Sequence, residues 1–285
     1  MLQLQLLVNG VLLAGLYVLI AVGLNLVFGV MRVINFAHGE LVVLASLMTA
    51  SAFTAYGTSP LLSLLAVVPV MFLLGYGIER LVIEPVVDTP QMVSLLTTFG
   101  LSLVLINGGL LLWGAEERAV PVLTGAFRIG TLAVPRVRVL TFGIAAAATL
   151  ALYAFLRLSD WGRAVRATAQ VPTIAQTCGI DVRRVRGLAF ALATALAALA
   201  GSLLVIMIPV DPQVGGLLIL KAFAVVVLGG LGNLLGALLG ALVLANAEVF
   251  AAYYVSPVLS EAVAFLVLLA LLLLRRHDPL AAGTA

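Results

Sequence analysis

The chain has 285 residues, of which 64% are hydrophobic and 9% are charged, whereas an ordinary soluble domain has about 45–50% apolar and about 25% charged residues. So much apolar surface needs lipid around it, which excludes a soluble enzyme and a disordered tail and predicts a polytopic membrane protein. The net charge of +3 comes from 15 basic and 12 acidic residues without a basic block, so nucleic acid is not an expected partner.

Apolar windows that suit helices follow one another along the whole chain. They lie at 7–30, 40–56, 60–78, 92–114, 139–157, 187–209, 217–230, 232–252 and 258–274. The seventh would reach only about 21 Å as a helix, less than the roughly 30 Å of a hydrocarbon core, so a re-entrant or broken element is expected there. The sequence therefore predicts an all-α transmembrane bundle of about eight spans plus one re-entrant or broken helix, forming a single domain over residues 1–285.

The distribution of arginines predicts the orientation of the chain. The N-terminus lacks the basic start of a cleaved signal peptide, so the first apolar window is expected to be a retained helix. The arginine-rich segment 158–186 is expected in the cytoplasm, because short basic loops stay there. If the seventh and eighth windows make one excursion into the membrane and back, alternation places the N-terminus in the periplasm and the C-terminus in the cytoplasm of an inner-membrane protein.

Segment 115–138, on the expected periplasmic side, alternates apolar and polar residues around Gly125 and Gly130. This alternation with turn-forming glycines favours a small hairpin at the membrane surface. An irregular loop with some β-branched residues fits the same pattern equally well.

A glycine-rich stretch follows the short seventh window. Gly236 and Gly240 continue the glycines at 229–232 with a spacing of four, which is typical of close helix packing. Asn233 beside the same run also suits a chain break within the membrane, tolerated inside protein or along a wet cavity. Asn35 occupies a similar position about 200 residues earlier, a faint symmetry typical of inverted-repeat transporters.

The densest polar group of the first half lies at 32–40, between two apolar windows. In one interpretation Asn35, His38 and Glu40 surround a helix break whose free backbone groups meet the ammonium and carboxylate of a zwitterion. In the other, the segment is a cytoplasmic turn whose polar residues satisfy helix ends. The chain has only two histidines, so a metal site is not expected.

Ionisable residues inside apolar windows are costly and are treated as functional candidates. Lys221, the single lysine, lies near the start of the seventh window, where it has three possible roles: meeting a substrate carboxylate, pairing with Glu248, or extending to the outer headgroups. Glu248 and Glu261 lie toward the outer ends of their windows, where a charge costs less.

Motifs for catalysis and nucleotide binding are missing from the sequence. We find no nucleophile elbow, no zinc-protease motif and no phosphate-binding loop. The single cysteine, Cys178, excludes an intramolecular disulfide. We therefore expect no catalytic residue and no cofactor in this chain, so that any ATP must be bound by another subunit.

The cytoplasmic segment 158–186 predicts a short helix. Pro172 suits its first turn and Gly179 its C-terminal end. Ile174, Ala175 and Cys178 then form a modestly apolar face, which suits either the groove of a partner protein or the surface of a bilayer.

Several stretches resemble permeases of ATP-binding-cassette importers. The segment around Arg166 and 175–180, followed by Phe190 and 200–201, resembles their coupling loop, with residues 173–175 in the place of Glu-Ala-Ala. Residues 23–40, 220–223 and 227–232 resemble the permease of the branched-chain amino acid uptake system, so the resemblance covers nearly the whole chain. The tail at 274–280 departs from the family's usual ending.

This resemblance implies the partners and the energy source. The permease would pair with a second, homologous permease, with two cytoplasmic ATPase subunits that bind ATP, and with a periplasmic substrate-binding protein docked on the outer surface. The loop residues expected to couple to an ATPase are Arg166, Pro172, Ile174, Ala175, Cys178 and Gly179. The residues expected along the substrate path are Asn35, Phe36, His38, Lys221, Phe223 and Asn233.

Alternatives to branched-chain amino acid import remain at this point. Close relatives of such permeases carry urea, short amides or other small organic solutes. A stand-alone channel or secondary transporter belongs to another class, disfavoured because no chain of carboxylates runs through the spans. An intramembrane hydrolase using His38 and Glu40 lacks a nearby nucleophile.

Overall fold

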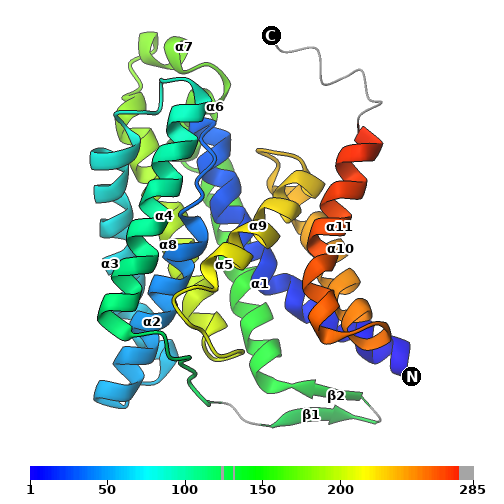
Figure 1. Ribbon diagram of the computed structural model, residues 1–285. Helices are drawn as coiled ribbons and strands as arrows, with labels where there is room; N and C mark the ends of the chain where they lie inside the picture. The colour runs from blue at the N-terminus through cyan, green and yellow to red at the C-terminus, as the bar shows by residue number, and fades with distance from the viewer. Residues whose placement is uncertain (123–124, 131, 276–285) are drawn as a thin grey trace.

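The computed structural model describes residues 1–122, 125–130 and 132–275 and consists almost entirely of helices (Figure 1). The divergent tail beyond residue 275 lies outside the described residues. The helices are α1 (Leu2–Met31), α2 (His38–Tyr56), α3 (Pro60–Ile78), the π-helical turn η1 (Glu79–Ile83), α4 (Gln91–Trp113), α5 (Arg136–Leu158), α6 (Asp160–Gln170), α7 (Pro172–Thr177), α8 (Val182–Leu204), α9 (Gly215–Gly229), α10 (Leu234–Tyr254) and α11 (Pro257–Arg275).

Each of the nine predicted windows contains a helix. Within the described residues, seven helices are long and apolar enough to cross a membrane, and α9 and the described part of α11 are shorter apolar helices. The 15 residues of α9 give a length of about 22 Å. The prediction of an element too short for a simple span is therefore confirmed, and α9 lies obliquely in the bundle (Figure 1).

Proline and capping side chains set several helix starts. Pro60 and Pro172 occupy the first turns of α3 and α7, where the missing N–H costs nothing. The Ser59 side chain caps α3 by accepting a hydrogen bond from the Leu62 N–H at 3.3 Å. Left-handed Gly57 ends α2 with φ of 62°.

α1 and α8 form the centre of the bundle. In their most apolar windows 83% and 78% of the residues are buried, against 22% for α3 with η1 and 17% for α4. α1 packs along α5, α8 and α10, while α8 also packs along α2 and α3. The helices around this centre present apolar faces outward, as lipid contact requires.

The contacts reveal an inverted repeat. α3 packs along α8 as α10 packs along α1, and α2 packs against α9 across the centre. In Figure 1, α1 and α8 run in opposite directions, as do α3 and α10. The elements α1–α4 thus correspond to α8–α11. The predicted symmetry between Asn35 and Asn233 is therefore wrong. Asn35 precedes α2, whereas Asn233 precedes α10, and α10 corresponds to α3 rather than to α2.

The predicted hairpin is present. β1 (Ala126–Ile129) pairs with β2 (Leu132–Pro135) in antiparallel register, with Arg128 opposite Ala133. It lies at the same end of the bundle as the N-terminus, and α6 and α7 lie at the opposite end (Figure 1). Gln5 of α1 holds β2 at this end through paired side-chain bonds to the backbone of Ala133. Which end faces the cytoplasm stays a prediction.

Candidate substrate pathway and coupling surface

The connection between α1 and α2 returns into the bundle. α1 ends at Arg32, whose left-handed φ of 55° turns the chain back. Asn35 is fully buried, and its Oδ1 accepts a bond from the Ala37 N–H at 3.1 Å. The Thr98 hydroxyl of α4 donates to the Ile34 carbonyl at 2.9 Å. The break thus leaves α2 starting among protein side chains, where non-helical backbone is tolerated.

His38 and Glu40 lie in the first turn of α2 and are both buried. His38 Nε2 lies 3.0 Å from the Ile20 carbonyl of α1. His38 Nδ1, one Glu40 carboxylate oxygen and the Asn35 amide nitrogen have no hydrogen-bond partner in the described part of the chain. Such unpaired groups are expensive when buried.

The starts of α2 and α9 lie against each other. A Cβ on Gly215, the first residue of α9, would come 2.1 Å from the Glu40 carboxylate, and one on Gly39 would come 2.1 Å from the Gly215 carbonyl oxygen. Glycine at both positions permits this approach. The two elements that correspond in the inverted repeat therefore meet through their first turns.

Lys221 forms a partly buried polar triad. Its Nζ lies 2.6 Å from Glu248 Oε1 of α10 and donates to the Tyr17 hydroxyl of α1 at 3.1 Å. The Tyr17 hydroxyl donates to the other Glu248 oxygen at 2.6 Å. Of the three roles considered for Lys221, the structure shows pairing with Glu248.

The connection between α9 and α10 is a glycine-based break. Gly230 and Gly232 have φ of 91° and 81°. The Gly232 N–H donates to the Asn25 side chain of α1 at 2.6 Å. Asn233 caps α10 by accepting from the Gly236 N–H at 3.1 Å.

Close packing occurs beside the same break. A Cβ on Gly236 would lie 1.8 Å from the Gly229 carbonyl oxygen, and one on Gly240 would lie 2.5 Å from the Val225 carbonyl oxygen. The glycine run therefore combines close helix packing with a chain break, and the position of that break within the membrane stays a prediction.

The residues expected along the substrate path do not form one cluster. His38 contacts α1 at Ile20, Lys221 contacts it at Tyr17, and the turn before Asn233 contacts it at Asn25. Phe36 and Phe223 are both half-buried. α1 thus acts as a common support for three polar contacts at successive levels.

The predicted short helix at Pro172 is confirmed as α7, with left-handed Gly179 following it at φ of 81°. The expected apolar face is only partly exposed. Ile174 is 60% exposed and Cys178 is exposed, whereas Ala175 is buried. The outward-facing apolar surface is therefore Ile174 with Cys178, which we call the α7 knob.

Arg166 belongs to α6 and is directed toward α5. Its guanidinium donates to the Leu156 carbonyl near the end of α5. This contact ties the two consecutive helices together rather than placing Arg166 beside the α7 knob.

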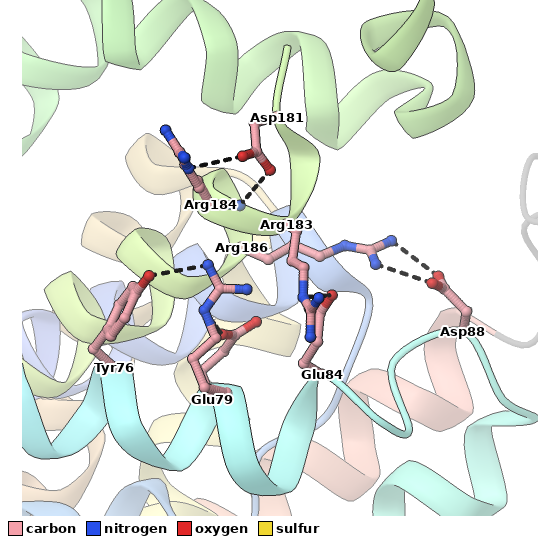
Figure 2. Close-up of polar contacts among 9 residues, drawn as sticks. Tyr76, Glu79, Glu84, Asp88, Asp181, Arg183, Arg184 and Arg186 are labelled. Carbon is pink, nitrogen blue, oxygen red and sulfur yellow. Dashed lines mark hydrogen bonds and ion pairs between the residues drawn. The ribbon is translucent and has the colours of Figure 1, made fainter.

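Ion pairs connect the start of α8 with the segment after α3 (Figure 2). Arg186 makes two bonds to the Asp88 carboxylate at 2.9 and 3.1 Å. Arg183 lies 3.1 Å from Glu84. Sequence reasoning missed these partners, although a signal was present, because an acidic segment at 79–88 faces a basic one at 183–186. We call Glu84, Asp88, Arg183 and Arg186 the end cluster.

Glu79 lies beside the end cluster but is enclosed. Its side chain is fully buried, and neither carboxylate oxygen has a hydrogen-bond partner in the described residues. The nearest cation is Arg80, with Nε 3.8 Å away, and Arg80 also donates to the Tyr76 hydroxyl at 3.0 Å. Gly187 of α8 leaves space for this carboxylate, since a Cβ there would come 3.0 Å from Glu79 Oε2.

The fold defines a class: an integral membrane protein whose inverted repeat and broken connections are typical of transporters. Residues 6–272 match the family described as branched-chain amino acid transport system, permease component. The chain belongs to this family.

Two curated permeases can be aligned with nearly the full length of this chain. The high-affinity branched-chain amino acid transport system permease protein LivH of Salmonella typhimurium is 34% identical, covering 95% of this chain and 92% of the relative. BraD of Pseudomonas aeruginosa, with the same description, is 34% identical over 95% and 94%. A more distant relative, the fructose import permease protein FrcC of Rhizobium meliloti, is 28% identical over 74% and 61%.

Proposed function

We propose that this chain is the permease subunit of an ATP-driven importer that carries branched-chain amino acids across the cytoplasmic membrane. The observation that supports this most is the match to branched-chain amino acid permeases over 95% of the chain. The described helices supply the membrane spans. A stand-alone channel or secondary transporter is not favoured by these relatives.

The proposed partners are those that the family implies, assigned to the two ends of the bundle. A second, homologous permease would complete the pathway, and a periplasmic binding protein would dock on the end that carries the hairpin. Two cytoplasmic ATPases would bind ATP, and one would receive the α7 knob in a groove. In this proposal the chain itself binds no nucleotide and catalyses no reaction.

The break before α2 is the proposed polar contact for the solute. The unpartnered atoms of Asn35 and His38 can bond the carboxylate or ammonium of an amino acid, and Phe36 and Phe223 offer apolar surface to a branched side chain. Lys221 is satisfied by Glu248, so it would reach a solute carboxylate only after that ion pair separates.

The end cluster gives a route from the ATPase to the spans. α7 leads directly into α8, whose first turns are tied to the segment after α3 by Arg186 and Arg183. A displacement of α7 would therefore move α8 and α3 together. A concerted displacement of these packed helices is the proposed source of alternating access.

Replacing Ile174 by Asp tests the coupling. The substitution places a charge on the exposed α7 knob and leaves the buried core intact, so membrane insertion and thermal unfolding should not change. Leucine uptake and substrate-stimulated ATP hydrolysis by the reconstituted transporter should fall more than tenfold, as expected for a contact residue at an interface centre.

Ile174→Leu keeps the apolar side chain and should retain uptake. Full uptake in Ile174→Asp would overturn the coupling role of α7. The solute is tested separately by supplying labelled leucine, isoleucine, valine and fructose to the same vesicles, where preference for fructose would overturn the assignment to amino acids.

A further inference from the structure

A cavity of about 620 Å³ lies between the later part of α1, the end of α5, α6 and the start of α10. Its walls are mainly apolar and include Leu26, Leu156 and Leu235. The cavity is far larger than a single water molecule needs, and apolar walls do not hold water well. It therefore has the size and chemistry of a site for an apolar chain.

Two arginines line the same cavity on the side of α6. Arg157 and Arg166 are both exposed, and neither has a carboxylate partner in the described part of the chain. The neighbouring carboxylate, Asp160, is already paired with Arg163, and no acidic residue lines the cavity. The cavity is therefore mainly apolar, with the amides of Asn25 and Asn233 in its wall, and cationic at one end.

Both guanidinium groups are held in place but retain free donors. Arg157 donates to the Tyr153 hydroxyl at 2.5 Å, and Arg166 donates to the Leu156 carbonyl. A guanidinium has five N–H donors in a planar fork that matches the oxygens of a phosphate. Each arginine thus keeps donors for a phosphate group.

Lipid can reach this cavity from the side. Leu150 and Leu158 on α5 and Leu235 and Leu239 on α10 are exposed apolar side chains on the two helices that flank it. Trp161, also exposed, lies at the start of α6, as is usual for aromatic residues at the level of the headgroups. An acyl chain could therefore enter from the hydrocarbon while its headgroup stays beside the arginines.

We propose that this cavity binds an anionic phospholipid from the leaflet on the α6 side, with its phosphate on Arg157 and Arg166 and an acyl chain against the apolar wall. A transported amino acid fits less well, because the cavity offers two arginines to its carboxylate but no carboxylate to its ammonium group. The site connects α5, α6 and α10, so the bound lipid would help to fix α6 ahead of the α7 knob. The inference requires only that the chain spans a membrane and is independent of the solute.

Native mass spectrometry of the assembled transporter in detergent tests this site. Added phosphatidylglycerol should bind more tightly than phosphatidylcholine with the same acyl chains. Arg157→Gln and the double variant Arg157→Gln/Arg166→Gln should lose about fivefold in phosphatidylglycerol affinity for each arginine removed. Arg163 is an exposed arginine of α6 that lies outside the cavity. Arg163→Gln is therefore the matched control and should bind phosphatidylglycerol as the unaltered chain does.

A second variant tests the apolar part without changing charge. A Cβ on Gly29 would make only ordinary contact with Gly232 Cα at 3.6 Å, so Gly29→Leu can fill the cavity within an intact fold. It should reduce phosphatidylglycerol binding although both arginines remain. Three results would each overturn the proposal. The first is equal binding of the two lipids, and the second is unchanged phosphatidylglycerol binding in both the double-arginine and Gly29→Leu variants. The third is displacement of the lipid by millimolar inorganic phosphate alone.

Discussion

The Lys221 triad and the end cluster use the same ion-pair chemistry in different surroundings. Lys221 and Glu248 are 16% and 14% exposed and lie within membrane helices, whereas each pair of the end cluster has one exposed partner, Arg183 at 66% and Asp88 at 79%. Charges removed from water interact strongly but cost much to desolvate. Exposed pairs gain about 0–1 kcal/mol. The difference indicates that the triad stabilises the packing of α1, α9 and α10, while the end cluster joins α8 to the segment after α3 at the surface of the bundle.

The largest expected effect comes from breaking the triad on one side. Lys221→Met leaves Glu248 buried without its cation, which should destabilise the protein by about 3–5 kcal/mol. The measurement is the apparent unfolding temperature of the purified permease in detergent. Lys221→Met/Glu248→Leu removes both charges and should recover most of the loss. A double variant no more stable than the single one would contradict this explanation.

An intermediate effect is expected at the better-buried pair of the end cluster. Asp88→Ala leaves Arg186, which is 8% exposed, without its two carboxylate bonds, and should cost about 1–2 kcal/mol. Because Arg186 ties α8 to the segment after α3, leucine uptake should fall several-fold at unchanged expression. Unfolding and uptake assays are compared with those of Asp181→Asn, which removes an exposed charge whose bonds lie at its own helix start and keeps a capping side chain there. Equal effects of the two variants would show that the link between α8 and this segment has no specific role in stability or uptake.

The smallest effect is expected for Arg183→Gln. This exposed arginine faces Glu84, and its loss should cost about 0.2–1 kcal/mol at low ionic strength. In 0.5 M NaCl the difference from the unaltered chain should disappear, because salt screens exposed pairs. The destabilisation by Lys221→Met should persist in the same buffer. If Arg183→Gln lost the same stability at both salt concentrations, the Arg183–Glu84 pair would resemble the triad rather than an exposed ion pair.

The helices and the α7 turn could be predicted from local sequence. Apolar runs of sufficient length must form helices in lipid, because the backbone has no other partner there. Pro172 and Gly179 marked α7 through their allowed backbone angles. The shortness of α9 was also readable from the length of its apolar window.

The contacts between distant helices could not be predicted in the same way. α1 is apolar on nearly every side, so its sequence does not distinguish a buried face from a lipid-facing one. The bonds from α1 to Lys221 and Gly232 span 204 and 207 residues of sequence. Ala175 shows the same difficulty at a smaller scale, since a six-residue helix is too short for its pattern to indicate which side faces inward.

Cys178 on the α7 knob is the single thiol of the chain and is exposed. A maleimide fluorophore or spin label would therefore attach at one defined position without any cysteine having to be removed first. Because Cys178 lies on the surface proposed to enter an ATPase groove, the rate of its labelling would report how far that surface is covered in the assembled transporter.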